Sequence, residues 1–169
     1  MSLNKLQIFN SLSGKKEEFI PLDKNHIKLY VCGPTVYANP HLGNARSAVI
    51  YDLLYRFLGQ IYPKVTYVRN VTNVDDKINQ AAIERKISIS ELTEEVLAEF
   101  HSDMQALCNL EPSFEPKVTD HINDIIAMIS LLIKNNHAYI ANNHVYFDVS
   151  SYENYGCLLY TSDAADDQA

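Results

Sequence analysis

The sequence is poor in cysteine and contains no long apolar run. Its three cysteines, Cys32, Cys108 and Cys157, are scattered without a paired spacing. This argues against the disulfide framework of a small secreted domain and for a reducing compartment. There is no stretch of about 18 apolar residues, the length that a membrane span needs. The first residues also lack the apolar core of a secretory signal. We therefore expect a cytoplasmic protein with no membrane partner.

Positive charge is scarce as well. The 169 residues carry 14 Lys and Arg against 21 Asp and Glu, a formal net charge of −7. Contacts to nucleic-acid phosphates need Lys and Arg, so this balance counts weakly against nucleic-acid binding, although a local basic patch would be enough. The 47% hydrophobic and 21% charged residues are ordinary for a globular chain with one buried core.

The C-terminal segment has an unusual composition. Residues 157–166 read Cys-Leu-Leu-Tyr-Thr-Ser-Asp-Ala-Ala-Asp, which matches at every position the translation of a DNA string resembling a transposon-end sequencing adapter. We interpret residues 157–169 as a non-native, adapter-derived tail; the alternative is a natural flexible C-terminus. Cys157 then carries no function, and the tail is left out of fold reasoning.

Residues 27–71 are predicted to form a strand–helix–strand unit. Residues 27–32 are β-branched and aromatic and are followed by Gly-Pro, which is typical of a buried strand. From residue 42 the apolar spacing becomes helical, with Gly59 as the expected end, and residues 65–71 form a second strand. A helical crossover between two strands indicates a parallel βαβ unit, so the fold class is α/β with a Rossmann-like doubly wound parallel sheet, which we expect to be incomplete in this chain.

Hairpins and helices are expected on both sides of this unit. Asp75 and Asp76 resemble a metal or acid–base pair, but we favour capping of a helix that starts there. Residues 88–91, Ser-Ile-Ser-Glu, form a capping-box pattern. The expected elements are a short hairpin or an irregular lead-in over 6–20, helices over 75–85, 88–107 and 120–135, and a hairpin over 138–149 turning at Asn142–Asn143. We assign residues 1–156 to the N-terminal part of a nucleotide-binding domain, with a connective helical and hairpin insertion over about 110–150.

Polar residues gather where both strands of the unit end. Cys32 ends the first strand, and Asn70, Thr72 and Asn73 follow the second. Residues 33–44 join the first strand to the helix. Ligands of doubly wound sheets bind beyond the carboxyl ends of the strands, so these segments are predicted to converge on one crevice.

The helix after the first strand opens with His41-Leu-Gly-Asn44. His41 and Asn44 are three residues apart and share a face. Both can donate hydrogen bonds to phosphate, beside the free N–H groups of the helix start, and Gly43 would let a flat ring or ribose approach. The alternative is that His41 caps the helix and Gly43 only relieves crowding. Neither Gly-x-Gly-x-x-Gly nor a Walker loop is present.

Residues 40–44, Pro-His-Leu-Gly-Asn, resemble the His-Ile-Gly-His signature of class I aminoacyl-tRNA synthetases. Residues 30–37, Tyr-Val-Cys-Gly-Pro-Thr-Val-Tyr, and residues 67–78, Tyr-Val-Arg-Asn-Val-Thr-Asn-Val-Asp-Asp-Lys-Ile, are similar to the cysteinyl-tRNA synthetase family. The resemblance covers residues 6 to 156. It implies an N-terminal fragment of an enzyme that uses ATP, with Mg, to form cysteinyl-adenylate and then passes the cysteinyl group to tRNA.

The resemblance also implies roles for individual residues. His41 and Asn44 would be the catalytic pair, although Asn44 replaces the second histidine of the signature and cannot be cationic. Cys32, Gly33 and Thr72 would contact the cysteine substrate. The implied ATP-binding residues are Pro34, Thr35, Tyr37, His41, Gly43 and Asn44.

Cys32 would also be one of four zinc ligands in this family, the zinc binding the substrate thiolate in preference to a serine hydroxyl. The other three ligands are expected beyond residue 156. Taken alone, Cys32 and Cys108 are each expected to be small buried hydrophobes. tRNA would bind through regions further downstream.

Two alternatives stay open on sequence. One is an enzyme of the same lineage that ligates cysteine to an amino-sugar in thiol biosynthesis. The other is a truncated, non-catalytic binding module or inert fragment, because a Lys-Met-Ser-Lys-Ser-like second signature is absent from the chain. We expect the 169-residue chain itself to form no adenylate.

Overall fold

The computed structural model describes residues 6–153 and residue 155. The predicted adapter-derived segment, residues 157–169, lies outside them. Contacts divide the chain into two compact units. One comprises residues 22–122, and the other comprises the residues on either side of it. Each unit is described separately.

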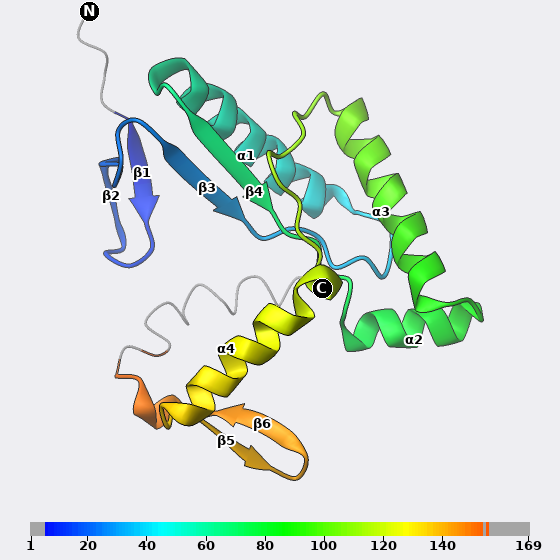
Figure 1. Cartoon of the computed structure of the whole chain (residues 1–169). Helices are drawn as coiled ribbons and strands as arrows, with labels where there is room; N and C mark the ends of the chain where they lie inside the picture. Colours follow the sequence, from blue (N-terminus) through cyan, green and yellow to red (C-terminus); the bar gives the residue numbers. More distant parts are fainter. Residues whose placement is uncertain (1–5, 154, 156–169) are drawn as a thin grey trace, which may run out of the picture. The chain divides into compact units, whose positions relative to one another are not determined.

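The larger unit is built on a parallel strand pair. β3 (Ile27–Val31) pairs in parallel with β4 (Val65–Arg69), and α1 (Leu42–Ile61) connects them and packs on both strands (Figure 1). This confirms the predicted strand–helix–strand unit. In β3 the residues alternate as a half-buried strand should: Ile27 and Val31 are buried, whereas Lys28 and Tyr30 are exposed.

α1 continues two residues past its predicted end at Gly59. The helix ends at Ile61, and Tyr62 is extended with φ −124° and ψ 146°. Pro63 follows, and the residue before a proline is restricted to extended backbone. A glycine inside a helix costs only about 1 kcal/mol, so the proline, not the glycine, ends this helix.

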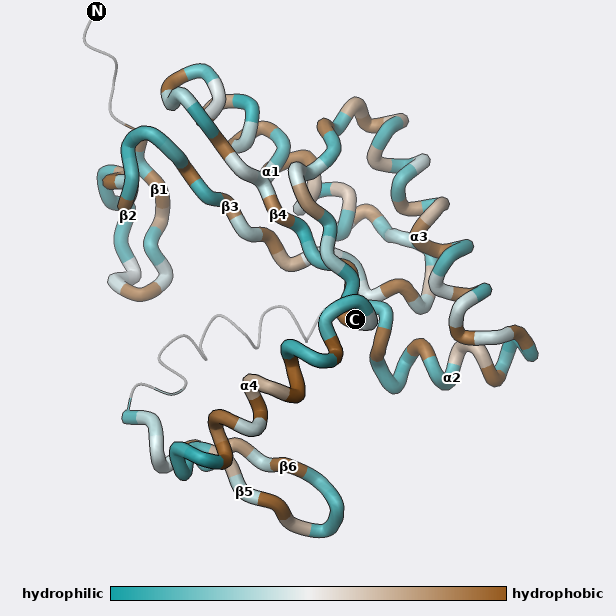
Figure 2. Tube along the Cα trace, viewed as in Figure 1, coloured by the Kyte–Doolittle hydropathy of each residue, from teal (hydrophilic) through white to brown (hydrophobic). Residues whose placement is uncertain are grey.

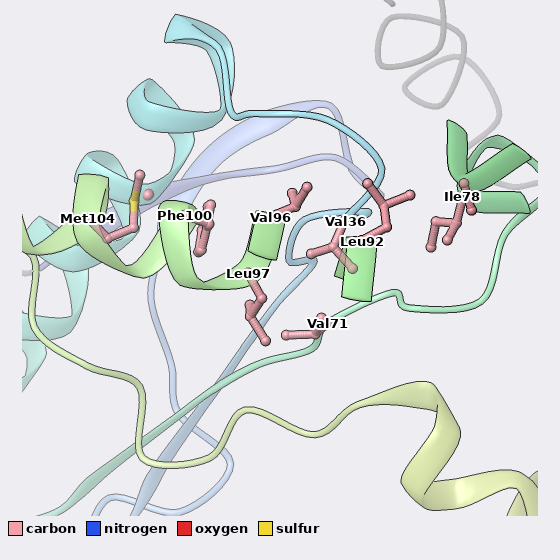
Figure 3. Packing of buried hydrophobic residues seen from close by; sticks show 10 residues of the cluster. Val36, Val71, Ile78, Leu92, Val96, Leu97, Phe100 and Met104 are labelled. Carbon is pink, nitrogen blue, oxygen red and sulfur yellow. The ribbon is translucent and has the colours of Figure 1, made fainter. Parts of the chain in front are cut away.

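α2 (Asp76–Arg85) and α3 (Ile89–Ala106) follow β4, and both begin at the predicted caps. The Asp75 carboxylate accepts from the Lys77 N–H at 2.8 Å, which confirms the capping interpretation over a metal pair. The Ser88 hydroxyl accepts from the Glu91 N–H at 3.1 Å. These helices bury apolar side chains against the segments that follow β3 and β4. Figure 3 shows this core, which includes Val36, Val71, Ile78, Leu92, Val96 and Phe100.

A short extended segment after α3 runs along the outer side of β4. Phe114 pairs with Val68 and Lys117 with Val71, both in parallel. The Arg69 N–H donates to the Phe114 carbonyl at 3.1 Å. Within residues 6–153 the three sheets are each two-stranded. The described part of the chain thus holds short strand pairs and no wide sheet, and the doubly wound sheet, which was expected to be incomplete in this chain, stays a prediction.

The smaller unit contains two hairpins and an amphipathic helix. β1 (Gln7–Asn10) pairs with β2 (Lys15–Glu18), and β5 (Ala138–Ala141) pairs with β6 (His144–Phe147). The first hairpin was one of two alternatives for residues 6–20, and the second was predicted, with Asn142 and Asn143 having the positive φ values of the predicted turn. α4 (Ile122–Lys134) is rich in apolar residues, which are brown in Figure 2. Two 3₁₀ turns, η1 (Val118–His121) and η2 (Val149–Ser151), complete the described elements. None of the helices described is long and apolar enough to cross a membrane.

Candidate functional site

The segments that follow β3 and β4 remain side by side beyond the strand ends. Thr35 pairs in parallel with Thr72. The Thr72 N–H donates to the Pro34 carbonyl at 3.0 Å, and the Val36 N–H donates to the Thr72 carbonyl at 3.1 Å. The predicted convergence of the two strand ends is therefore present, and it places the loop that starts at Cys32 against Thr72.

Gly33 lies at the closest approach between these two segments. Its N–H donates to the Asn70 side-chain Oδ1 at 2.9 Å. A Cβ on residue 33 would lie 1.7 Å from the Asn70 carbonyl oxygen and 3.0 Å from Cγ of Arg69. Because no side chain fits there, this position requires glycine for steric reasons alone.

His41 and Asn44 together form a complete capping box at the start of α1. Nδ1 of His41 accepts from the Gly43 N–H at 3.0 Å, and Oδ1 of Asn44 accepts from the His41 N–H at 2.9 Å. The alternative weighed on sequence, that His41 caps the helix, is therefore realised. So is the crowding at Gly43, where a Cβ would lie 2.7 Å from the His41 ring.

The capping box leaves one donor on each of these side chains. Because Nδ1 of His41 accepts a hydrogen bond, the neutral ring carries its proton on Nε2. Within the described residues neither Nε2 of His41 nor Nδ2 of Asn44 has a hydrogen-bond partner. Both are thus available to an acceptor outside the helix, and capping does not compete with ligand binding.

A small cavity of about 60 Å³ joins the end of β3 to the start of α1. Its lining includes Cys32, Gly33 and Asn44, so residues from the two predicted subsites reach one hollow. The volume has room for only about two water molecules. It therefore marks where the segments meet and is not itself a nucleotide pocket.

Arg69 and Phe100 form another wall of this cavity and were not identified from the sequence. The Arg69 guanidinium lies 4.8 Å from the Phe100 ring centroid and donates from Nε and Nη2 to Oε1 of Glu115 at 2.9 and 2.7 Å. Beside it, burial raises the pKa of the Tyr67 phenol. No sequence signal indicates the ion pair, because its members are 46 residues apart.

Two further residues predicted at the site, Tyr37 and Asn73, make contacts within the fold. Tyr37 packs on the core, and Nζ of Lys77 lies 5.5 Å from its ring centroid. Asn73, predicted at the crevice, exchanges hydrogen bonds with Thr119 at 2.8 and 3.2 Å. Asn73 thus belongs to the joint between β4 and the segment after α3.

The two cysteines in the described residues are not buried, contrary to the expectation for each taken alone. Cys32 and Cys108 are both exposed free thiols, so the buried interpretation is wrong for each. Cys108 has a left-handed φ of 58° where α3 ends, which exposes it. Residues 6–153 hold no group of three or more His, Cys, Asp or Glu side chains able to bind a metal ion. Cys32 alone therefore does not constitute a zinc site.

Comparison with known proteins defines the class of this domain. A family profile described as the catalytic domain of class I (C) tRNA synthetases matches residues 18–168. The chain therefore belongs to this family, as the motifs around residues 30–44 and 67–78 indicated.

Individual relatives agree with this assignment. Cysteine–tRNA ligase of Wolbachia pipientis subsp. Culex pipiens (strain wPip) is 51% identical over 153 residues, covering 90% of this chain and 33% of the relative. The cysteine–tRNA ligases of Rickettsia bellii (strain OSU 85-389) and Pelagibacter ubique (strain HTCC1062) are 55% and 52% identical, over 89% and 88% of the chain. The chain spans about a third of the length of the curated relatives it matches.

Proposed function

We propose that the complete protein containing this chain ligates cysteine to its tRNA through a cysteinyl-adenylate, with ATP and Mg, in the cytoplasm. The supporting observation is the identity of 51–55% with three cysteine–tRNA ligases over about nine tenths of the chain. The βαβ unit of β3, α1 and β4 would then be part of a doubly wound sheet completed by regions outside this sequence, and tRNA would bind through those regions.

The start of α1 is proposed as the ATP site. Nε2 of His41 and Nδ2 of Asn44 would donate to phosphate oxygens, supported by the partial positive charge of the helix N-terminus. The lack of a side chain at Gly43 would let the adenosine approach the backbone, and Pro34, Thr35 and Tyr37 are proposed to contribute to the same site. Attack of a carboxylate on the α-phosphorus needs positioning and charge stabilisation, which these donors would supply.

The cysteine substrate is proposed to bind where β3 and β4 end. Cys32 and Gly33 follow β3, and Thr72 follows β4 and pairs with Thr35 of the segment after β3. A zinc ion would need donors beyond the one that Cys32 offers, and no step is derived through it. For the same reason we propose that the 169-residue chain alone forms no adenylate.

The test begins with the parent gene, sequenced past codon 156 from DNA that never carried an adapter. The complete product and the 169-residue chain are then compared in cysteine-dependent ATP–pyrophosphate exchange. We expect exchange with cysteine and none with serine from the complete product, and only background from the chain. Exchange by the chain would show that it is catalytically sufficient. Absence of exchange from the complete product would favour the non-catalytic binding module.

The molecule that accepts the cysteinyl group distinguishes the proposed tRNA ligase from the alternative enzyme that ligates cysteine to an amino-sugar. A complete product that charges tRNA and leaves an amino-sugar unmodified supports the proposal. Transfer of cysteine to the amino-sugar, without charging of tRNA, would assign it instead to thiol biosynthesis.

A further inference from the structure

The segments beyond β3 and β4 contain a one-residue bulge. Val31 is paired with Arg69, and the next pairing is Thr35 with Thr72. Between these pairs lie three residues on the segment after β3, residues 32–34, and two residues on the segment after β4, residues 70 and 71. Such bulges re-aim side chains and are uncommon between parallel strands.

Burial confirms this register. On the second segment Tyr67, Arg69 and Val71 are buried at unbroken spacing of two. On the first, Val31 and Val36 are buried although they are five residues apart, which strict alternation would place on opposite faces. The extra residue within 32–34 therefore returns Val36 to the core, while Cys32 is exposed because it follows the buried Val31.

The Asn70 side chain closes the bulge. The Gly33 N–H, displaced from the backbone ladder, donates to Oδ1 of Asn70 at 2.9 Å. This bond fixes the orientation of the amide, because an N–H group needs an acceptor. Nδ2 then faces Thr72 and donates to its Oγ1 at 3.3 Å. One side chain thus links the loop of Cys32 to the hydroxyl of Thr72.

The direction of the hydrogen bond between Asn70 and Thr72 determines whether the Thr72 hydroxyl can donate to a ligand. Its hydroxyl oxygen accepts from Nδ2 of Asn70, so its hydrogen is free to donate to another group. An aspartate at position 70 would keep the acceptor for Gly33 but would draw the Thr72 hydrogen toward its own carboxylate. The amide and the carboxylate therefore differ at Thr72 while sharing the bond to Gly33.

We propose that Asn70 is a positioning residue for the cysteine substrate: it locks the 32–34 bulge and directs the Thr72 hydroxyl into the site. This inference rests on the proposed function for the identity of the substrate. It adds a residue that contacts neither ATP nor cysteine but sets the spacing of the groups proposed to bind cysteine. The effect belongs to cysteine binding and not to the ATP site at the start of α1.

The test measures pyrophosphate exchange by the complete gene product while cysteine and ATP are varied separately. Loss of one hydrogen bond in the site corresponds to a rise of about tenfold in KM for cysteine. We expect this rise in Asn70→Ala and in Asn70→Asp, with KM for ATP unchanged. Asn70→Asp retains the bond to Gly33 and should keep the wild-type Tm, which separates positioning from loss of folding. Asn73→Ala is the matched control, since it removes an amide bonded to Thr119, and it should keep both KM values.

A second readout does not depend on catalysis. With a chelator present, alkylation of Cys32 is followed by peptide mass spectrometry, with Cys108 as the internal reference. Asn70→Ala should speed alkylation of Cys32 and leave Cys108 unchanged. Wild-type KM for cysteine in both Asn70 variants, or an unchanged Cys32 rate in Asn70→Ala, would overturn the inference. A wild-type product without exchange activity would instead overturn the proposed function, while the Cys32 rate still decides whether Asn70 holds the bulge.

Discussion

Asn44 serves two purposes with the two ends of one amide. Its oxygen accepts the His41 N–H and completes the capping box, while its nitrogen stays free within the described residues. Histidine in the signature of the family would combine an acceptor and a donor in a similar way. The substitution in this chain therefore preserves the neutral donor and gives up the capacity for positive charge.

Asn44→Asp separates these two purposes in the complete gene product. The carboxylate still accepts from His41, and an acid in the first helical turn is favourable, so stability should be unchanged or slightly higher. The donor to phosphate is replaced by a repelling oxygen, and KM for ATP should rise about tenfold or more. Exchange kinetics and thermal unfolding measure the two effects. Asn44→His is the control and should retain activity, whereas an unchanged KM for ATP in Asn44→Asp would reduce Asn44 to a cap.

Sequence reasoning predicted that the ends of the two strands converge, but not the hydrogen bonds that join them. It placed Cys32, Gly33 and Thr72 together because the carboxyl ends of parallel strands share one edge. It named Asn70 at that edge but not its bonds, since they depend on a one-residue register change that period-two patterns do not reveal. Arg69 and Glu115 were missed for a similar reason, because pairing across 46 residues is decided by tertiary packing.

At the scale of the elements, the sequence signals for helix N-termini were more reliable than those for helix C-termini. Asp75 and Ser88 cap α2 and α3 as predicted. The pattern at 88–91 suggested a reciprocal box, yet among the described residues a complete box is found at His41 and Asn44, which do not match the usual Ser/Thr and Glu/Gln pattern. The end of α1 was misplaced because glycine only weakens a helix, whereas proline prevents its continuation.

The cap of α3 can be tested with a serine pair in the 169-residue chain. Ser88→Ala removes the acceptor of the Glu91 N–H and should lower the free energy of unfolding by about 1 kcal/mol. Ser90, two residues later, has a hydroxyl that bonds only the exposed Glu94 side chain, so Ser90→Ala should change stability by less than about 0.5 kcal/mol. Urea unfolding followed by circular dichroism gives both values. Equal losses would show that the Ser88 bond contributes nothing specific.

At the scale of the whole molecule, much apolar surface remains uncovered. On α1, one face is buried through Ala48 and Leu58, while the opposite face exposes large side chains. These are Val49, Ile50, Leu53, Phe57 and Ile61. The predicted doubly wound sheet is also incomplete in the described chain, because β3 has β4 as its one strand neighbour. Sequence patterns identify a strand but do not supply the partners that make a sheet wide.

Substitution of two leucines on α1 tests the difference between its buried and its exposed face. Leu53 is 67% exposed and Leu58 is 2% exposed. In the 169-residue chain, Leu53→Lys should alter the free energy of unfolding by less than about 0.5 kcal/mol and reduce binding of a hydrophobic dye. Leu58→Lys should cost more than about 3 kcal/mol, because it buries a charge and removes core packing. If Leu53→Lys also unfolds the chain, that face is covered in solution.

The bulge at residues 32–34 makes the segments beyond β3 and β4, here called the rim of the site, sensitive to insertion or deletion of a residue. The same bulge makes the rim tolerant of substitutions in the two strands. The paired residues of β3 and β4 can be exchanged for other residues of similar size without moving the rim, because the bulge separates the two registers. Deleting one residue from 32–34 would merge the registers and turn Val36 from the core toward the opposite face. In a lineage that keeps this site, substitutions should therefore accumulate in the strands, while single-residue insertions and deletions should be excluded between Val31 and Thr35.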